Sequence, residues 1–227
     1  MTVKHIDYVI TGSSSGVGKS LAENLMLQGY KILGISRSTP NINTDQYIHI
    51  NCDFSKPEEV EKVCLELKNY QGIKGLVNNA SSFSQHRFHE VQNADIIDAL
   101  TTNTFSAFSI SKAISEFNSN FNIVNISSFS GLQGKEKFSG LLSYGISKSA
   151  IITLSEYMAV ELKPKGIRVN CIAPGAVKTD MLKQAFPDAW SSAAEVSDLV
   201  NTIIFFLSEK SKPTTGKIFE FESGSNN

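Results

Sequence analysis

The chain has 227 residues, of which 41% are hydrophobic and 19% are charged, and its formal net charge is −1. This length predicts a single domain, residues 1–227, with one well-buried core. The balanced charge, without a basic cluster, excludes nucleic acid as a partner, because such binding requires lysine and arginine concentrated on one face.

Short apolar runs alternate with longer segments of helical period along the whole chain. The strands are predicted at residues 5–10, 30–36, 47–51, 75–79, 122–127, 167–174 and 217–221, and the helices at residues 18–29, 58–69, 94–117, 144–163 and 195–208. This alternation predicts a Rossmann-type α/β fold, in which a doubly wound parallel sheet of about seven strands carries helices on both faces. Residues 182–194 have no clear period, so we expect an irregular connection that either folds over a ligand or is an ordinary surface loop.

A glycine-rich turn, TGSSSGVG, follows the first predicted strand and leads into the first helix. Gly12 permits a tight turn, Gly16 lets the backbone approach a pyrophosphate, and Gly18 allows close helix packing. Backbone N–H groups at the start of a helix favour an anion. The pattern indicates dinucleotide contacts from Gly12, Ser14, Ser15, Gly16, Val17 and Gly18. The alternative is a glycine turn with a purely structural role.

The end of the second strand bears on the choice of cofactor. Ser36 stands where an acid would accept the ribose hydroxyls of NAD, and Arg37 can pair with the 2′-phosphate of NADP. We therefore favour NADP(H), with NAD(H) and a merely solvated Arg37 as the alternatives. Asp53 is placed to meet the adenine; its competing role is to cap the helix that opens at Pro57, although Ser55 suits that role better.

Further motifs complete a resemblance to the short-chain dehydrogenase/reductase family over essentially the full length. They are CDFS (52–55), NNA (78–80), Asn103, NISS (125–128), the Tyr144 to Lys148 segment YGISK, and NCIAPGAVKTDM (170–181). Each motif is modest alone, but their order and spacing together are highly specific. The resemblance implies an oxidoreductase of the short, single-domain type, which interconverts a carbonyl compound and a secondary alcohol.

The same resemblance assigns roles to individual residues. It implies a catalytic tetrad of Asn103, Ser128, Tyr144 and Lys148. In the family the lysine also bonds the nicotinamide ribose, and the asparagine holds a water that relays protons. The implied cofactor contacts after the glycine turn are Asn79, Ala80, Tyr144, Lys148, Pro174, Gly175, Val177 and Thr179.

The chemistry explains why these residue types are needed. Reduction of a carbonyl requires hydride at carbon and a proton at oxygen, and Tyr144 would supply the proton. A free phenol has a pKa of about 10, and Lys148, one helical turn later on the same face, would favour the phenolate. Ser128 would donate a hydrogen bond to the substrate oxygen. Its competitor Ser127 should point to the other face, because side chains alternate along a strand.

Two departures from the family pattern keep a second function open. Ser81 replaces the glycine of the usual NNAG, and the acidic, diglycine C-terminal pattern survives only as Glu222, Ser223 and Gly224. The alternative is therefore a catalytically weak NAD(P)-binding sensor or assembly protein of the same fold. The family also implies a homodimer or homotetramer, through the helices that carry Asn103 and Tyr144.

Metal, membrane and disulfide roles are not expected. The three cysteines, Cys52, Cys64 and Cys171, are too widely spaced for a disulfide framework or a zinc site. The four histidines, His5, His49, His86 and His89, lack metal-ligand spacing and partner carboxylates. The start of the chain has no signal-peptide pattern, and the longest apolar run, residues 203–207, cannot span a bilayer. We expect a cytoplasmic enzyme with a small-molecule substrate.

Overall fold

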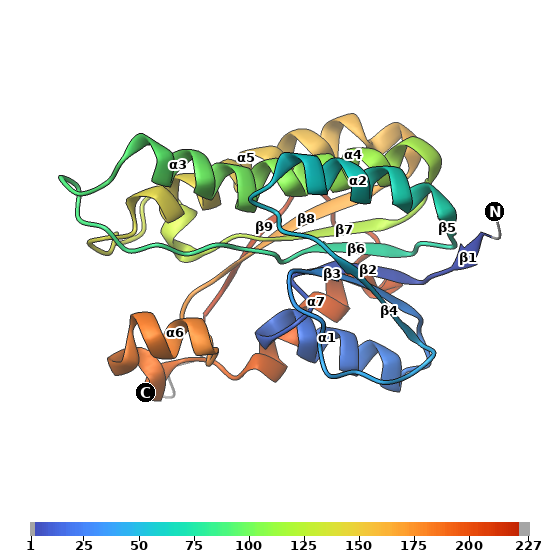
Figure 1. The fold of residues 1–227 in the computed structure, drawn as a ribbon, viewed down its shortest axis with the longest axis horizontal. Helices are drawn as coiled ribbons and strands as arrows, with labels where there is room; N and C mark the ends of the chain where they lie inside the picture. The colour runs from blue at the N-terminus through green and yellow to red at the C-terminus, as the bar shows by residue number, and fades with distance from the viewer. Residues whose placement is uncertain (1–2, 223–227) are drawn as a thin grey trace.

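The computed structural model of the chain describes residues 3–222, and a seven-stranded sheet runs through its centre (Figure 1). All neighbouring strands are parallel, in the order β4-β3-β2-β6-β7-β8-β9. The strands are β2 (Tyr8–Thr11), β3 (Ile32–Ser36), β4 (Tyr47–Asn51), β6 (Gly75–Asn78), β7 (Asn122–Ile126), β8 (Arg168–Pro174) and β9 (Ile218–Phe221). The predicted doubly wound, seven-stranded Rossmann-type fold is confirmed.

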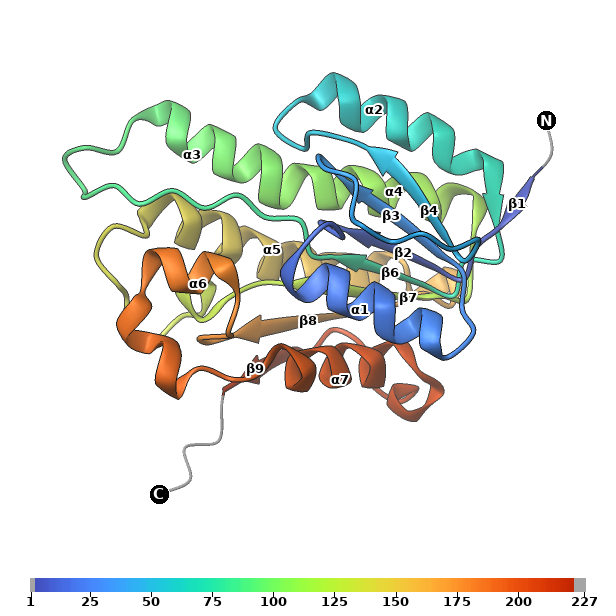
Figure 2. The same ribbon diagram turned by 60° about the horizontal axis from the view of Figure 1, so that its bottom comes forward.

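Helices cover both faces of this sheet, so its central strands are buried and largely apolar. Their buried polar side chains are hydrogen-bonded, as Asn78 of β6 is to Asn125 of β7. The helices are α1 (Gly16–Leu27), α2 (Pro57–Glu66), α3 (Asn93–Leu100), α4 (Ser106–Phe117), α5 (Leu142–Glu161), α6 (Asp180–Ala185) and α7 (Val196–Leu207). Figure 2 shows α1 and α7 together on one face, with α2, α4 and α5 on the other. Leu21 and Ile203 belong to the first of the two resulting cores, and Ile110 and Met158 belong to the second.

The first predicted strand was wrong at its start. Lys4–His5 forms a separate short strand, β1, which pairs with β5 (Tyr70–Gln71) outside the main sheet. Asp7 breaks the run because its carboxylate accepts a hydrogen bond from the backbone N–H of Lys31 at 2.8 Å and lies 2.8 Å from the ammonium of Lys74.

Two histidines do have carboxylate neighbours, contrary to the expectation from the sequence. His5 lies 3.5 Å from Asp7, and His86 lies 3.5 Å from Asp95. His5 and Asp7 are only two residues apart in the chain, whereas His86, in the loop before α3, meets Asp95 only in the fold. Spacing along the chain therefore did not reveal the second pair.

The predicted helix over residues 94–117 is interrupted at Asn103. A π-helical turn, Thr101–Phe105, separates α3 from α4, and the backbone N–H of Ser106 donates to the carbonyl of Thr101. A π-turn inserts one extra residue into the helix and often occurs at functional sites. It places Asn103 in the interior, where only 2% of its surface is exposed.

Residues 182–194 are more regular than predicted. They continue α6 and then form a 3₁₀ helix, Pro187–Ser192. Thr179 caps α6 by accepting a hydrogen bond from the backbone N–H of Leu182 at 3.3 Å. Figure 2 shows this segment beside the carboxyl end of β8. Ser223 and Gly224 of the C-terminal motif lie outside the described residues, and within residues 3–222 no helix is long and apolar enough to cross a membrane.

Candidate active site

A cleft of about 860 Å³ opens beside the carboxyl ends of the strands. The order of the sheet reverses between β2 and β6, and ligands of open α/β sheets bind at such a point. The cleft is lined by most of the predicted site residues: Gly12, Ser14, Ser15, Gly16, Val17, Ser36, Arg37, Asp53, Asn79, Ala80, Ser128, Tyr144, Lys148, Pro174, Gly175, Val177 and Thr179. Two predicted residues, Gly18 and Asn103, are not among those that line it.

The glycine turn packs closely against the end of β6 and leads into helix α1 beside the cleft. Gly12 has a φ of +68°, and a Cβ there would lie 2.8 Å from the Cα of Ala80. Helix α1 begins at Gly16, and Ser15 at its N-cap makes no side-chain capping bond. Ser15, Gly16 and Val17 line the cleft, and the free backbone N–H groups of a first helical turn suit an anion. These residues fit the pyrophosphate of a dinucleotide.

Gly18 lies behind this turn and does not face the cleft. It is buried, and a Cβ there would come within 2.3 Å of the carbonyl oxygen of Gly12. Gly18 thus allows α1 to pack against the turn, as expected of this glycine; its contact with a cofactor stays a prediction.

Hydrogen bonds fix the turn to the end of β6. The hydroxyl of Thr11 accepts from the backbone N–H groups of Asn79 and Ala80, both at 3.0 Å. The side-chain amide of Asn79 donates in return to the carbonyls of Thr11 and Gly12, both at 3.1 Å. Asn79 thus holds the turn in place from the neighbouring strand.

A second support comes from strand β4 and was missed in the sequence. The hydroxyl of Ser13, fully buried in the turn, lies 2.8 Å from the phenol oxygen of Tyr47. The phenol passes over Gly34, where a Cβ would lie only 1.9 Å from it. Burial raises the pKa of Tyr47, and the bond to Ser13 partly opposes this. The sequence signal for this contact was Gly34, because a glycine inside a buried strand often marks a place where another group approaches the backbone closely.

The end of β3 presents Arg37 to the cleft. Ser36 is buried, and its hydroxyl donates to the carbonyl of Ser38 at 3.0 Å and lies 3.1 Å from Nε2 of His49. The carbonyl of Arg37 accepts from the side-chain amide of Asn51. The backbone here is fixed, while the guanidinium of Arg37 is exposed at the rim.

Asp53 forms a local turn at the cleft. Contrary to the expectation from the sequence, Ser55 does not cap α2. The carboxylate of Asp53 accepts from the hydroxyl of Ser55 at 2.8 Å and from its backbone N–H at 3.1 Å. These bonds lower the pKa of Asp53, with a smaller contribution from the charge of Arg37. The N-cap of α2 is Lys56. Ser55 is unavailable as a cap because its hydroxyl is donated to Asp53.

Tyr144, in the first turn of α5, directs its phenol to the cleft. Burial raises the pKa of Tyr144, while hydrogen bonds with the hydroxyls of Ser128 and Ser81 lower it. Ser128 follows β7 and caps a short 3₁₀ turn. The hydroxyl of Ser127 donates instead to the carbonyl of Lys148 at 2.7 Å. Ser81, which replaces a glycine of the family pattern, thus places a second hydroxyl at the phenol.

Lys148 is the most deeply buried charged group of the site. Only 2% of its surface is exposed, and its ammonium donates to the carbonyl of Ile126 at 2.9 Å. The ammonium lies 5.5 Å from the centre of the Tyr144 ring. Burial lowers the pKa of Lys148 to about 8. Burial therefore disfavours the charged form of this lysine.

Asn103 supports this arrangement from behind. Its Oδ1 accepts from the backbone N–H of Ser82 at 2.6 Å, and its Nδ2 donates to the carbonyl of Ser82 at 3.1 Å and to the hydroxyl of Ser147 at 2.8 Å. The amide thus joins the loop after β6 to α5. The sequence analysis did not identify Ser147 as the partner of Asn103. The available signal was its position three residues after Tyr144 and next to Lys148.

Comparison with known proteins agrees with this geometry. A sequence profile described as short chain dehydrogenase matches residues 7–190. The chain is 27% identical to the 3-oxoacyl-(acyl-carrier-protein) reductase FabG of Vibrio cholerae and 29% identical to carbonyl reductase family member 4 of Xenopus laevis, over 95% of each chain in both cases.

The solved structures agree in fold. A short chain dehydrogenase family protein of Francisella tularensis superposes with a TM-score of 0.86 at 24% identity, over 97% of this chain and 98% of that one. At this sequence identity the structural similarity establishes only the fold, and the match to the sequence profile establishes the family. The chain belongs to the short-chain dehydrogenase/reductase family, whose members are NAD(P)-dependent oxidoreductases.

Proposed function

We propose that the protein reduces a carbonyl compound, or oxidises the matching secondary alcohol, with NADP(H) as its preferred cofactor. The observation that carries this proposal is the Tyr144 phenol at the cleft, hydrogen-bonded to Ser128 and 5.5 Å from the ammonium of Lys148. Residues from Gly12 to Glu222 line the same cleft, so we propose that residues 1–227 act as a single cofactor-binding and catalytic domain.

The residues on one side of the cleft would hold the dinucleotide. The N–H groups at the start of α1 would bind its pyrophosphate, and Arg37 would pair with a 2′-phosphate. The segment from Pro174 to Thr179 would flank the nicotinamide, and Asp53 would meet the adenine; all of these residues except Lys178 line the cleft. A bound nicotinamide dinucleotide supplies the hydride that the carbonyl carbon receives.

The protein side supplies the proton. Tyr144 donates its phenolic proton to the carbonyl oxygen, and Ser128 donates a hydrogen bond to the same oxygen as charge develops there. Lys148 favours the phenolate that remains, because opposite charges attract strongly in a water-poor site. Asn103 positions α5 through Ser147. In the direction of oxidation, Tyr144 takes the proton back.

A turnover screen tests this function. Purified protein is mixed with NADPH and a panel of ketones and aldehydes, and cofactor oxidation is followed by its absorbance. We expect at least one substrate to turn over, and the loss of that turnover in Tyr144→Phe. Cofactor binding without turnover across the panel, in both directions, would instead indicate a sensor or assembly protein.

Cofactor choice is tested at Arg37. Arg37→Asp should weaken NADPH binding by about 10- to 100-fold, because a charge-assisted hydrogen bond to phosphate contributes about 1.5–3 kcal/mol and the new carboxylate repels the phosphate. NADH binding should change much less. Dissociation constants for both cofactors come from fluorescence titration. Arg87→Asp, at an exposed arginine that does not line the cleft, is the control. An unchanged ratio of the two constants would refute the role of Arg37.

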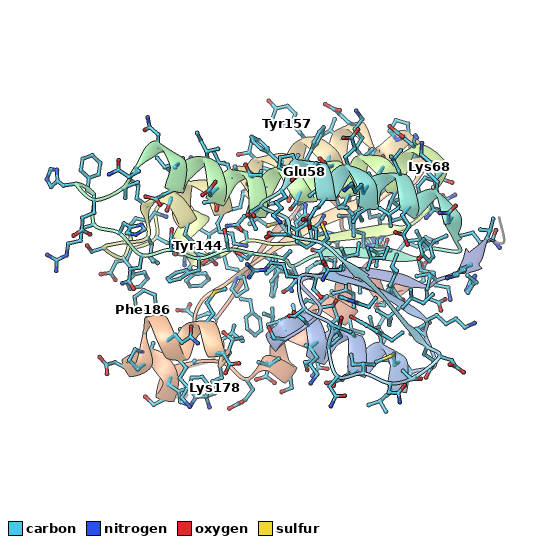
Figure 3. All side chains as sticks on the ribbon, viewed as in Figure 1. Glu58, Lys68, Tyr144, Tyr157, Lys178 and Phe186 are labelled. Atoms are coloured by element: carbon cyan, nitrogen blue, oxygen red, sulfur yellow. The ribbon has the colours of Figure 1, made fainter. Side chains whose placement is uncertain are left out.

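We also propose that two or four copies assemble through the outer face of α4 and α5. Phe105, Phe108, Tyr157 and Val160 are exposed there, Val160 by 72%, and Figure 3 shows Tyr157 on the outer side of this helical layer. Burying such side chains against a second copy removes apolar surface from water.

Light scattering on a sizing column checks this assembly. Wild-type protein should have the mass of two or four chains, and Tyr157→Asp combined with Val160→Asp should shift it towards the mass of one. Leu27→Asp, at an exposed leucine on α1, should leave the mass unchanged. A wild-type mass of one chain would overturn the assembly.

A further inference from the structure

The substrate side of the cleft is lined by a connected row of aromatic rings. The rings of Phe83 and Tyr144 meet edge to face, with centroids 5.3 Å apart and planes at 68°. Phe186 continues the row at 6.4 Å from Phe83, and Phe138 lies 6.2 Å from Phe186. All four rings line the cleft, so the row leads directly to the phenol oxygen.

These rings come from segments that are far apart in the sequence. Phe83 follows β6, Phe138 precedes α5, and Phe186 ends α6. Figure 3 shows Tyr144 and Phe186 at the same end of the molecule, with Phe186 on the side of the α6 segment that faces Tyr144. The fold thus gathers three phenylalanines at one position, and we call them the phenylalanine wall.

Aliphatic side chains also contribute to this cleft. Leu141, Leu182 and Ala185 line it together with polar residues such as Ser82 and Asp180. Phe138 keeps 52% of its surface exposed, which leaves a large apolar surface at the mouth of the cleft. Its burial by a ligand would be favourable. The wall is therefore a surface suited to an apolar group.

We infer that the substrate carries a flat aromatic group next to its carbonyl, as an aryl ketone or aryl aldehyde does, and that the phenylalanine wall binds this group. The inference rests on the proposed function, since it names the substrate class of the same site. Aromatic pairs prefer centroids 4.5–7 Å apart in edge-to-face or offset arrangements. The observed spacings and interplanar angles, from 53° to 77°, lie in this regime. A further ring can add to the row in the same geometry.

A pair of alcohols separates aromatic recognition from simple apolar binding. 1-Phenylethanol and 1-cyclohexylethanol have the same carbon skeleton, but only the first has a flat ring. Both are titrated into protein saturated with the reduced form of whichever nicotinamide dinucleotide binds more tightly. An alcohol cannot react with the reduced cofactor, so ligand-observed NMR measures binding alone.

The variants keep apolar volume and remove the ring. Wild-type protein should bind 1-phenylethanol about 2- to 12-fold more tightly than 1-cyclohexylethanol. This range corresponds to the extra stabilisation that an aromatic pair provides in addition to the burial of apolar area. Phe186→Leu and Phe138→Leu should each reduce this ratio towards one. Phe108→Leu, on the outer face of α4, should leave it unchanged. Two wall variants are made so that a folding defect in one does not remove the test.

The outcomes are distinguishable from those of the proposed function. Equal binding of the two alcohols by wild-type protein, or an unchanged preference in both wall variants, would overturn the inference. Preference for the aromatic alcohol with no turnover of any carbonyl compound would contradict the enzyme and leave the aromatic site standing. Turnover without aromatic preference would contradict only the inference.

Discussion

Tyr144→Phe is expected to lower kcat by about 10²- to 10⁴-fold, the contribution typical of a positioned general acid. The substitution removes only the phenolic oxygen. The ring keeps its contact with Phe83 at 5.3 Å, and the glycine turn that binds the cofactor is not touched. The dissociation constant of the dinucleotide should therefore stay almost unchanged. Steady-state rates with the best substrate of the screen and a fluorescence titration of the cofactor measure the two effects.

The same helix offers a matched control for this variant. Tyr157 is exposed by 65% on α5 and does not line the cleft. Tyr157→Phe should therefore keep full turnover. A Tyr144→Phe variant as active as the wild type would show that the proton comes from another group. Loss of cofactor binding in the same variant would show that the substitution disturbs more than the proton donor.

Lys148→Met is expected to abolish turnover and to stabilise the protein. Burial lowers the pKa of Lys148 to about 8 from an ordinary value of 10.5. At 1.36 kcal/mol per pKa unit, keeping the lysine charged in the fold costs about 3 kcal/mol near neutral pH. Methionine loses the hydrogen bond to the carbonyl of Ile126, which costs about 1 kcal/mol. The free energy of unfolding at pH 7 should rise by about 2 kcal/mol.

The pH dependence identifies the cause of this gain. The folded pKa of Lys148 is lowered, so between pH 8 and 10.5 the unfolded chain binds more protons than the folded one. The contribution of the lysine to stability therefore improves as pH rises through this window, and the advantage of the methionine variant shrinks.

Urea unfolding at pH 7 and pH 9.5 checks both parts of this prediction. Lys62→Met, at an exposed lysine on α2, should show neither the stability gain nor the pH dependence. A Lys148→Met variant that is less stable than wild type at pH 7 would contradict the assigned cost of burying the charge.

The sheet was predictable because its information is local. Buried parallel strands such as β2 and β3 are largely apolar on both faces, and this is visible in the sequence as short runs rich in Ile, Leu and Val. The spacing of Gly12, Gly16 and Gly18 similarly reports a local turn. The sequence therefore predicted a doubly wound parallel sheet, and most of the predicted site residues line the cleft.

The features that were missed depend on contacts between distant segments. The place of Ser81 beside the phenol of Tyr144 requires the end of β6 to meet α5. The π-turn at Asn103 lies inside a segment whose period indicates one continuous helix. The helical form of residues 182–194 depends on the cap at Thr179, which bonds the backbone of Leu182, and on Pro187 at the first position of the 3₁₀ helix. No single stretch of sequence contains these answers.

The hydroxyl pair of Ser13 and Tyr47 couples the edge of the sheet to the cofactor turn. Among residues 3–222, strand β4 pairs with β3 alone, and an edge strand of this kind opens more readily than the centre of a sheet. Opening β4 would withdraw Tyr47 from Ser13 and release the turn. A dinucleotide that binds only the formed turn therefore opposes that opening by mass action. Backbone amides of β4 should exchange with solvent more slowly when cofactor is bound, although the strand lies behind the turn.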